Sequence, residues 1–197
     1  MKTPSTRHLE AIVIGGSAGG IDALLALLPR LPSGYSLPIV IVLHLPDERD
    51  SRLAEIFAAR LSLPVREARD KETIQPGTVY FAGAGYHLSI EADRSFSLSC
   101  EPPLHFSRPS IDILMESAAD AYGPALLGIL LTGANDDGAA GLCHVQERGG
   151  MTVVQDPSEA HIATMPAAAI DIFTPDKILK LQDIHALLLT LDDSHAH

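Results

Sequence analysis

Apolar positions follow two different patterns along this chain. Short, largely β-branched runs of four to six residues alternate with longer segments in which apolar residues recur at helical spacing. Runs of the first kind are typical of strands buried on both faces of a parallel sheet, and segments of the second kind are typical of the helices that cover it. The strand-like runs are residues 11–14, 39–43, 126–131 and 151–154. The helical segments are residues 21–28, 52–61, 110–121, 139–148 and 177–191.

The alternation predicts an α/β fold with a doubly wound, mostly parallel, Rossmann-like sheet and helices on both faces. Residues 78–82 and 87–90 flank a glycine-containing turn and predict a β-hairpin excursion, with a further short strand at residues 95–99. We interpret His87, at the start of the second hairpin strand, as part of the hairpin and not as a catalytic base.

The composition is that of one folded domain. Of the 197 residues, 46% are hydrophobic, which excludes a disordered chain. We expect the domain to cover residues 10–191, with an N-terminal arm at residues 1–9 and a C-terminal tail at residues 192–197.

The net charge of −11 argues against a nucleic-acid partner. No apolar run approaches the roughly 20 residues that a membrane span needs, so we expect no membrane insertion.

The cysteine count and the polar first residues favour the cytoplasm. Cys100 and Cys143 are too few for a disulfide framework and lack the spacing of metal ligands. The polar stretch at residues 1–8 shows no signal peptide. No His, Asp and Glu cluster suggests a metal ion, and we expect no cofactor.

A serine flanked by glycines joins the first strand to the first helix. Residues 15–19 read GGSAG, a G-x-S-x-G pattern, and a strained turn there lifts the Ser17 hydroxyl above the sheet edge. Free N–H groups at the start of the helix then face any anion that forms nearby. Such a turn also holds phosphate in many α/β proteins, or is only structural. The usual dinucleotide pattern is not met, because Ser17 stands where its second glycine belongs.

A histidine and two aspartates follow other predicted strands. His44 comes directly after residues 39–43, and Asp136 and Asp137 lie in the loop after residues 126–131. Because parallel strands place their carboxyl ends on one edge, Ser17, His44 and one of these acids can meet there as nucleophile, base and orienting acid. The Ala18 N–H and an N–H near Ala134 are candidate donors to an oxyanion.

The order Ser, His, Asp differs from that of α/β-hydrolases. Structural readings also remain open: a histidine at a strand end often only hydrogen-bonds its surroundings, and Asp136 suits a helix cap.

Several segments together resemble a known family. They are residues 14–20, 43–46, 58–61, 76–82, 108–112, 131–141, 155–157 and 165–166. With them the chain, from about residue 11 to about residue 188, resembles the catalytic domain of the chemotaxis protein-glutamate methylesterase. The resemblance implies a serine carboxylesterase that hydrolyses glutamate methyl esters on the cytoplasmic helices of methyl-accepting chemotaxis receptors, and that in many members also deamidates receptor glutamines.

The resemblance also implies the site residues. Matched by motif, Ser17 is the nucleophile, His44 the base and Asp137 the acid, with Asp136 as second choice. The oxyanion donors are the backbone N–H groups of Ala18 and Ala134.

The chain departs from the family pattern in three places. Ala18 replaces a usual threonine, and Ala134 and Asn135 replace a Met-Gly pair. The usual amino-terminal phospho-receiver domain is absent from the sequence, so we expect a stand-alone form or part of a differently built protein. These departures leave an alternative open: a non-enzymatic module on the same fold that binds receptors or a small anion.

Overall fold

The computed structural model describes residues 8–44, 52–104 and 107–193. A seven-stranded sheet runs through the molecule in the order β3-β4-β2-β1-β7-β8-β9, and every neighbouring pair in it is parallel. The order reverses between β1 and β7, which makes the sheet doubly wound and confirms the predicted fold class. The strands are β1 (Ala11–Gly16), β2 (Ile39–Leu43), β3 (Val65–Glu67), β4 (Val79–Phe81), β7 (Leu126–Leu130), β8 (Met151–Gln155) and β9 (Lys177–Leu179).

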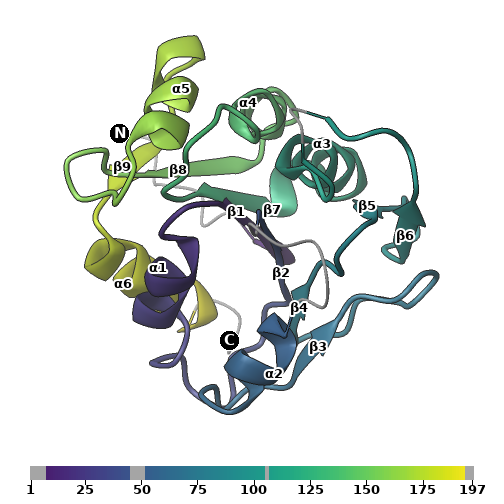
Figure 1. The fold of residues 1–197 in the computed structure, drawn as a ribbon. Coiled ribbons are helices and arrows are strands. Elements are labelled where there is room, and N and C mark those ends of the chain that lie inside the picture. Colours follow the sequence, from purple (N-terminus) through teal and green to yellow (C-terminus); the bar gives the residue numbers. More distant parts are fainter. Residues whose placement is uncertain (1–7, 45–51, 105–106, 194–197) are drawn as a thin grey trace.

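Helices cover both faces of this sheet (Figure 1). Consecutive β1 residues point to opposite faces, so that Ala11 and Val13 join one buried cluster and Ile12 and Ile14 join the other. The first cluster includes side chains of α3, α4 and α5, and the second includes those of α1, α2 and α6. The helices are α1 (Gly20–Leu27), α2 (Leu53–Ala58), α3 (Ile111–Tyr122), α4 (Ala139–Glu147), α5 (Thr164–Ile172) and α6 (Leu181–Asp193), with a 3-10 turn η1 (Gly123–Ala125).

The hairpin lies elsewhere than the sequence predicted. β5 (His87–Ile90) pairs antiparallel with β6 (Phe96–Ser99), whereas β4 belongs to the central sheet between β2 and β3. The prediction that residues 78–82 pair with residues 87–90 is therefore wrong. All three β4 residues are buried, and such a strand needs cover on both faces, which only the central sheet supplies.

The C-terminal segment also differs from its prediction. Residues 177–191 were expected to form one helix, but Lys177–Leu179 is the edge strand β9, paired with β8, and α6 begins at Leu181. The helix then continues through Asp193, and the Asp192 carboxylate accepts hydrogen bonds from the N–H and the hydroxyl of Ser36, both at 2.8 Å. The expected tail from residue 192 thus starts within α6. The predicted arm at residues 1–9 lies mostly outside the described residues.

In the described part of the chain, no helix is both long and apolar enough to span a membrane.

Candidate active site

The sheet brings Ser17, His44 and Asp137 to one edge. Ser17 directly follows β1, His44 follows β2, and Asp137 lies in the loop after β7. Because β1 lies between β2 and β7, the three residues leave adjacent parallel strands at their carboxyl ends. The backbone fixes the approach: the Ser17 N–H donates to the Thr132 carbonyl at 2.9 Å, and the His44 N–H donates to the Gly16 carbonyl at 3.1 Å.

An open pocket of about 520 Å³ lies at this edge. Both Ser17 and His44 line it, but none of the hydrogen bonds among the described residues joins Ser17 to the imidazole. Catalytic hydrogen bonds are often long without substrate and shorten only in the complex. The other lining residues are Ala18, Gly19, Ile21, Asp22, Ser107 and Asn135.

The turn at Ser17 depends on glycine. Gly19 precedes α1 with φ of +81°, a conformation that L side chains rarely adopt, and a Cβ there would lie 2.7 Å from Cβ of His161. The Gly20 N–H closes the turn by donating to the Ser17 carbonyl at 2.7 Å. This tight turn places Ser17 at the N-terminal end of α1, where backbone N–H groups favour negative charge.

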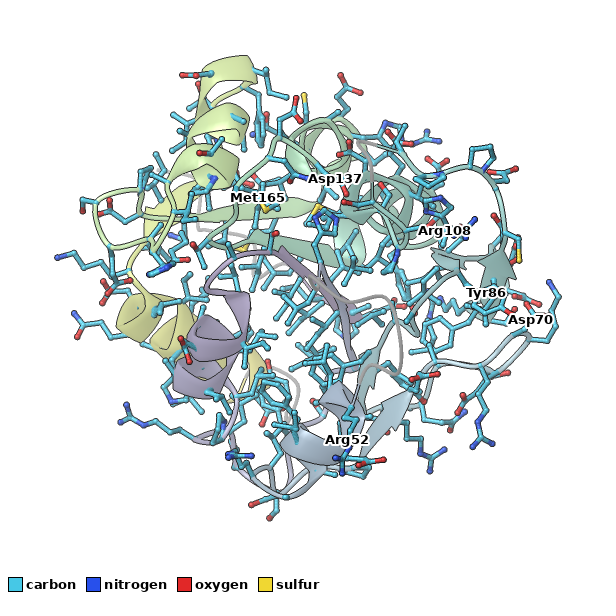
Figure 2. The ribbon with its side chains drawn as sticks, viewed as in Figure 1. Arg52, Asp70, Tyr86, Arg108, Asp137 and Met165 are labelled. Carbon is cyan, nitrogen blue, oxygen red and sulfur yellow. The ribbon has the colours of Figure 1, made fainter. Side chains whose placement is uncertain are left out.

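His44 and Asp137 are directly hydrogen-bonded. His44 Nε2 lies 2.8 Å from Oδ2 of Asp137, whose side chain is fully buried, while the imidazole is about one-tenth exposed. The same carboxylate closes the N-terminus of α3: it accepts from the Ser110 hydroxyl at 2.9 Å and from the N–H groups of Ile111 and Asp112 at 2.8 and 3.0 Å. Figure 2 shows Asp137 beside α3 and α4.

These donors decide the protonation of Asp137. Burial alone raises the pKa of a carboxyl, but the hydrogen bonds from His44, Asp112 and Ile111 outweigh burial and hold the pKa of Asp137 below its usual value. The ionised carboxylate can only accept, so His44 Nε2 carries the proton of their hydrogen bond. Nδ1 of a neutral imidazole is then a free base, and the Ser107 hydroxyl lies 3.4 Å from it.

Asp136, the second choice for the acid, is placed differently. It is exposed, and it is the neighbouring Asp137 that contacts His44. Its expected role as helix cap is also not what the structure shows. Gly138 is the residue that precedes α4, and the Asp136 backbone carbonyl accepts from the Ala139 N–H at 3.1 Å.

A second serine and histidine lie close to Asp137. The backbone N–H of Ser110 donates to His87 Nδ1 at 3.1 Å, while the Ser110 hydroxyl donates to Asp137. His87 Nε2 lies 3.1 Å from the Pro102 carbonyl and so carries the proton of this contact. Ser110 is fully buried and its hydroxyl is turned to the carboxylate, so this group supports Asp137 and presents no nucleophile to the pocket. The interpretation of His87 as a hairpin residue agrees with these contacts.

No pattern in the sequence indicated Ser107 as a site residue. Its loop is held by Arg108, whose guanidinium donates to the carbonyls of Cys100 and Glu101 at 3.2 and 3.1 Å. Figure 2 shows Arg108 on the side of the molecule that carries the β5–β6 hairpin. Ser107 lines the pocket, and only the tertiary fold brings it to His44.

The loop after β7 is tied to the serine turn by Thr132. The Thr132 hydroxyl lies 2.9 Å from the Ala18 carbonyl and accepts from the Ile162 N–H at 2.9 Å, and the buried Gln155 side chain accepts from the Thr132 N–H at 2.8 Å. These contacts fix the backbone that leads to Ala134. Among the described residues, no acceptor is hydrogen-bonded to the N–H of Ala18 or of Ala134.

Asn135 lines the pocket, and its Oδ1 is buried with no hydrogen-bond partner among the described residues. No group of three or more His, Cys, Asp or Glu in that part of the chain could hold a metal ion.

Known proteins are similar to this chain in sequence and in fold. The family model described as CheB methylesterase matches residues 12–188. A putative protein-glutamate methylesterase/protein-glutamine glutaminase of Leptospira interrogans is 47% identical over 188 residues, which cover 95% of this chain and 97% of the relative. A protein-glutamate methylesterase/protein-glutamine glutaminase of Trichodesmium erythraeum is 36% identical over 91% of this chain, which spans 52% of that longer relative. The crystal structure of the Thermotoga maritima CheB methylesterase catalytic domain matches with a TM-score of 0.88 and 31% identity, covering 93% of this chain and 98% of that one. The chain therefore belongs to the CheB methylesterase family.

Proposed function

We propose that this chain is a serine hydrolase of protein-glutamate methyl esters, with Ser17 as nucleophile, His44 as general base and Asp137 as orienting acid. The hydrogen bond of 2.8 Å between His44 Nε2 and Asp137, at a pocket that Ser17 also lines, carries this proposal. It leaves the basic Nδ1 of His44 as the nitrogen that receives a proton from a serine hydroxyl.

The reaction proceeds in two steps, formation of an acyl-serine and its hydrolysis. Nδ1 of His44 takes the proton of Ser17 as Oγ attacks the ester carbonyl carbon, and the imidazolium then returns this proton to the departing methoxy group, which leaves as methanol. Water hydrolyses the acyl-serine by the same route and frees the glutamate carboxylate. Asp137 stays ionised throughout and stabilises the imidazolium in both steps.

The proposed oxyanion donors are the backbone N–H groups of Ala18 and Ala134. Both lack a described acceptor, and that of Ala18 lies at the N-terminal end of α1. Donors that are already in place stabilise the charge that develops on the carbonyl oxygen without further rearrangement. Neither donor depends on a side chain, so the replacement of threonine by Ala18 leaves this function intact.

The proposed substrates are methylated glutamates of methyl-accepting chemotaxis receptors. The names of the relatives include glutamine hydrolysis, and the same groups can release ammonia from a receptor glutamine. We place the reaction in the cytoplasm. Both cysteines, Cys100 and Cys143, are free, as is usual where thiols stay reduced.

Methanol release from methylated receptor cytoplasmic fragments tests the activity and the nucleophile together. We expect Ser17→Ala to lower kcat at least about 10⁴-fold, because no attacking hydroxyl remains. Ser97→Ala, on β6 and outside the pocket, is the matched control and is expected to keep the wild-type rate. Equal methanol release by wild type and Ser17→Ala would overturn the assignment of Ser17.

The non-enzymatic alternative makes an opposite prediction. A binding module on this fold would release no methanol from any fragment and would not be labelled by a fluorophosphonate. Labelling of wild type that is lost in Ser17→Ala, together with methanol release, excludes it.

A further inference from the structure

At the start of each of the helices α3 and α4, backbone N–H groups donate hydrogen bonds to a carboxylate from the start of the other helix. Asp137, just before α4, accepts hydrogen bonds from the first N–H groups of α3. Asp112, in the first turn of α3, accepts in return: its Oδ1 lies 2.9 Å from the Gly138 N–H and 2.7 Å from the Gly141 N–H of α4. Asp112 is 3% exposed and Asp137 is fully buried, so both carboxylates depend on these donors in place of water.

These hydrogen bonds hold the backbone of Asp137 in place. The Gly138 N–H belongs to the peptide group that directly follows Asp137, so the bond from Asp112 holds that peptide against α3. The helices are close at the second bond too, where a Cβ on Gly141 would lie 2.9 Å from the Asp112 Cα. Without Asp112, the peptide at Gly138 would lose the acceptor that sets its orientation.

We propose that Asp112 is a positioning residue for the hydrolysis: it holds the Asp137–Gly138 peptide so that the Asp137 carboxylate meets His44 Nε2. This inference rests on the proposed function for its catalytic consequence, but the placement of Asp137 against His44 can be measured without any substrate. Asp112 does not line the pocket, and its hydrogen bonds link it to Asp137 and to the peptide that directly follows Asp137.

Proton NMR of the full chain detects the hydrogen bond between His44 Nε2 and the Asp137 carboxylate directly. An imidazole N–H that donates to a buried carboxylate gives a far-downfield proton resonance, which we expect in wild type and expect to vanish in His44→Gln. In Asp112→Ala we expect the resonance to be lost, because the peptide at Gly138 is released. In Asp112→Asn we expect it to remain, because the amide oxygen still accepts from both N–H groups.

Asp176→Ala is the matched control. Asp176 also accepts a backbone N–H, that of Thr152 at 2.9 Å, but it directly precedes β9, which is an edge strand of the sheet. We expect this variant to keep the resonance, even where urea unfolding shows it to be as destabilised as Asp112→Ala. If Asp112→Ala does not fold, Asp112→Ser takes its place, because the shorter side chain cannot span both N–H groups.

Methanol release then measures the catalytic effect. We expect Asp112→Ala to lower kcat about 10²-fold with KM unchanged, as for a misplaced catalytic group, and Asp112→Asn to stay within about threefold of wild type. A folded Asp112→Ala that keeps both the resonance and kcat overturns the inference. Loss of the resonance in Asp112→Asn also overturns it, because the charge of Asp112 and not its geometry would then be needed. Absence of methanol release from wild type, with the resonance intact, contradicts the proposed function alone.

Discussion

Two serine hydroxyls share the pocket with His44, and their surroundings differ. Ser107 is the nearer in the described contacts, with its hydroxyl 3.4 Å from Nδ1, which is too long for a strong hydrogen bond. Ser17 stands on a glycine turn at the N-terminus of α1, beside an N–H group with no described acceptor. A nucleophile needs such donors for the oxyanion that its attack creates, so we assign the attack to Ser17.

The variant Ser107→Ala separates the two hydroxyls. We expect it to keep kcat/KM within about tenfold of wild type, because it removes only a weak contact to the imidazole and no reacting atom. The measurement is methanol release beside Ser17→Ala, and fluorophosphonate labelling of each variant is its control. Abolished labelling in Ser107→Ala with retained labelling in Ser17→Ala would reverse the two roles.

The packing of β1, α3 and α4 leaves no room for side chains at two glycines. A Cβ on Gly15 of β1 would lie 2.2 Å from Cγ2 of Ile111, and a Cβ on Gly138 would lie 2.6 Å from the same atom. Gly138 also has φ of +95°, where an L side chain is strained in any surroundings. The start of α3 can therefore approach both the serine strand and the acid loop.

Three glycine-to-alanine variants separate backbone strain from steric overlap. Gly34 has nothing within 4 Å of its added Cβ and no positive φ, so Gly34→Ala is expected within about 0.5 kcal/mol of wild type. Gly85 has φ of +80° in open space, so Gly85→Ala is expected to lower the free energy of unfolding by about 1 kcal/mol. Gly138→Ala combines strain with overlap, and a loss of about 3 kcal/mol is expected. Urea unfolding measures all three, and equal losses for Gly85→Ala and Gly138→Ala would contradict the steric part.

The sequence predicted the positions of the strands along the chain better than it predicted which strands pair with one another. The apolar runs at β1, β2, β7 and β8 were found because burial on both faces leaves a continuous pattern. The pairing of β4 was missed because a three-residue strand fits a hairpin and a sheet equally well. The strand β9 was read as helix because it has one exposed apolar residue and leads directly into α6.

The candidate site shows the same limit. Ser17, His44 and the pair Asp136 and Asp137 could be named because they follow strands, and parallel strands place their carboxyl ends on one edge. Only the family resemblance singled out Asp137 from this pair. Ser110, Asp112 and Ser107 act through contacts across 26 to 63 residues of sequence, which no local pattern records. Residues 108–112 were noted as a matching segment, but their role at the start of α3 became visible only in the fold.

Asp137 joins the proposed catalysis to the stability of the domain. Its carboxylate ties the loop after β7 to α3 and to the residue after β2, so it contributes to the contact between separate parts of the fold. The described donors favour its ionised form over its neutral form. A protein with a net charge of −11 gains from such local donors, because its other carboxylates repel a buried negative charge.

The pH dependence of unfolding tests this role of Asp137. Its pKa in the folded state is lowered, so the unfolded state binds the proton more readily, and the stabilisation is fully present above the unfolded pKa of about 3.9 and is lost as the pH falls through the folded pKa. We expect Asp137→Asn to be less stable than wild type at pH 7, and the difference to shrink as the pH falls below about 4. Urea unfolding from pH 7 to pH 3 measures it, and repeating the pair in His44→Gln removes the titration of the imidazole. A stability difference that stays constant or grows towards low pH would show that the folded protein does not favour the ionised carboxylate.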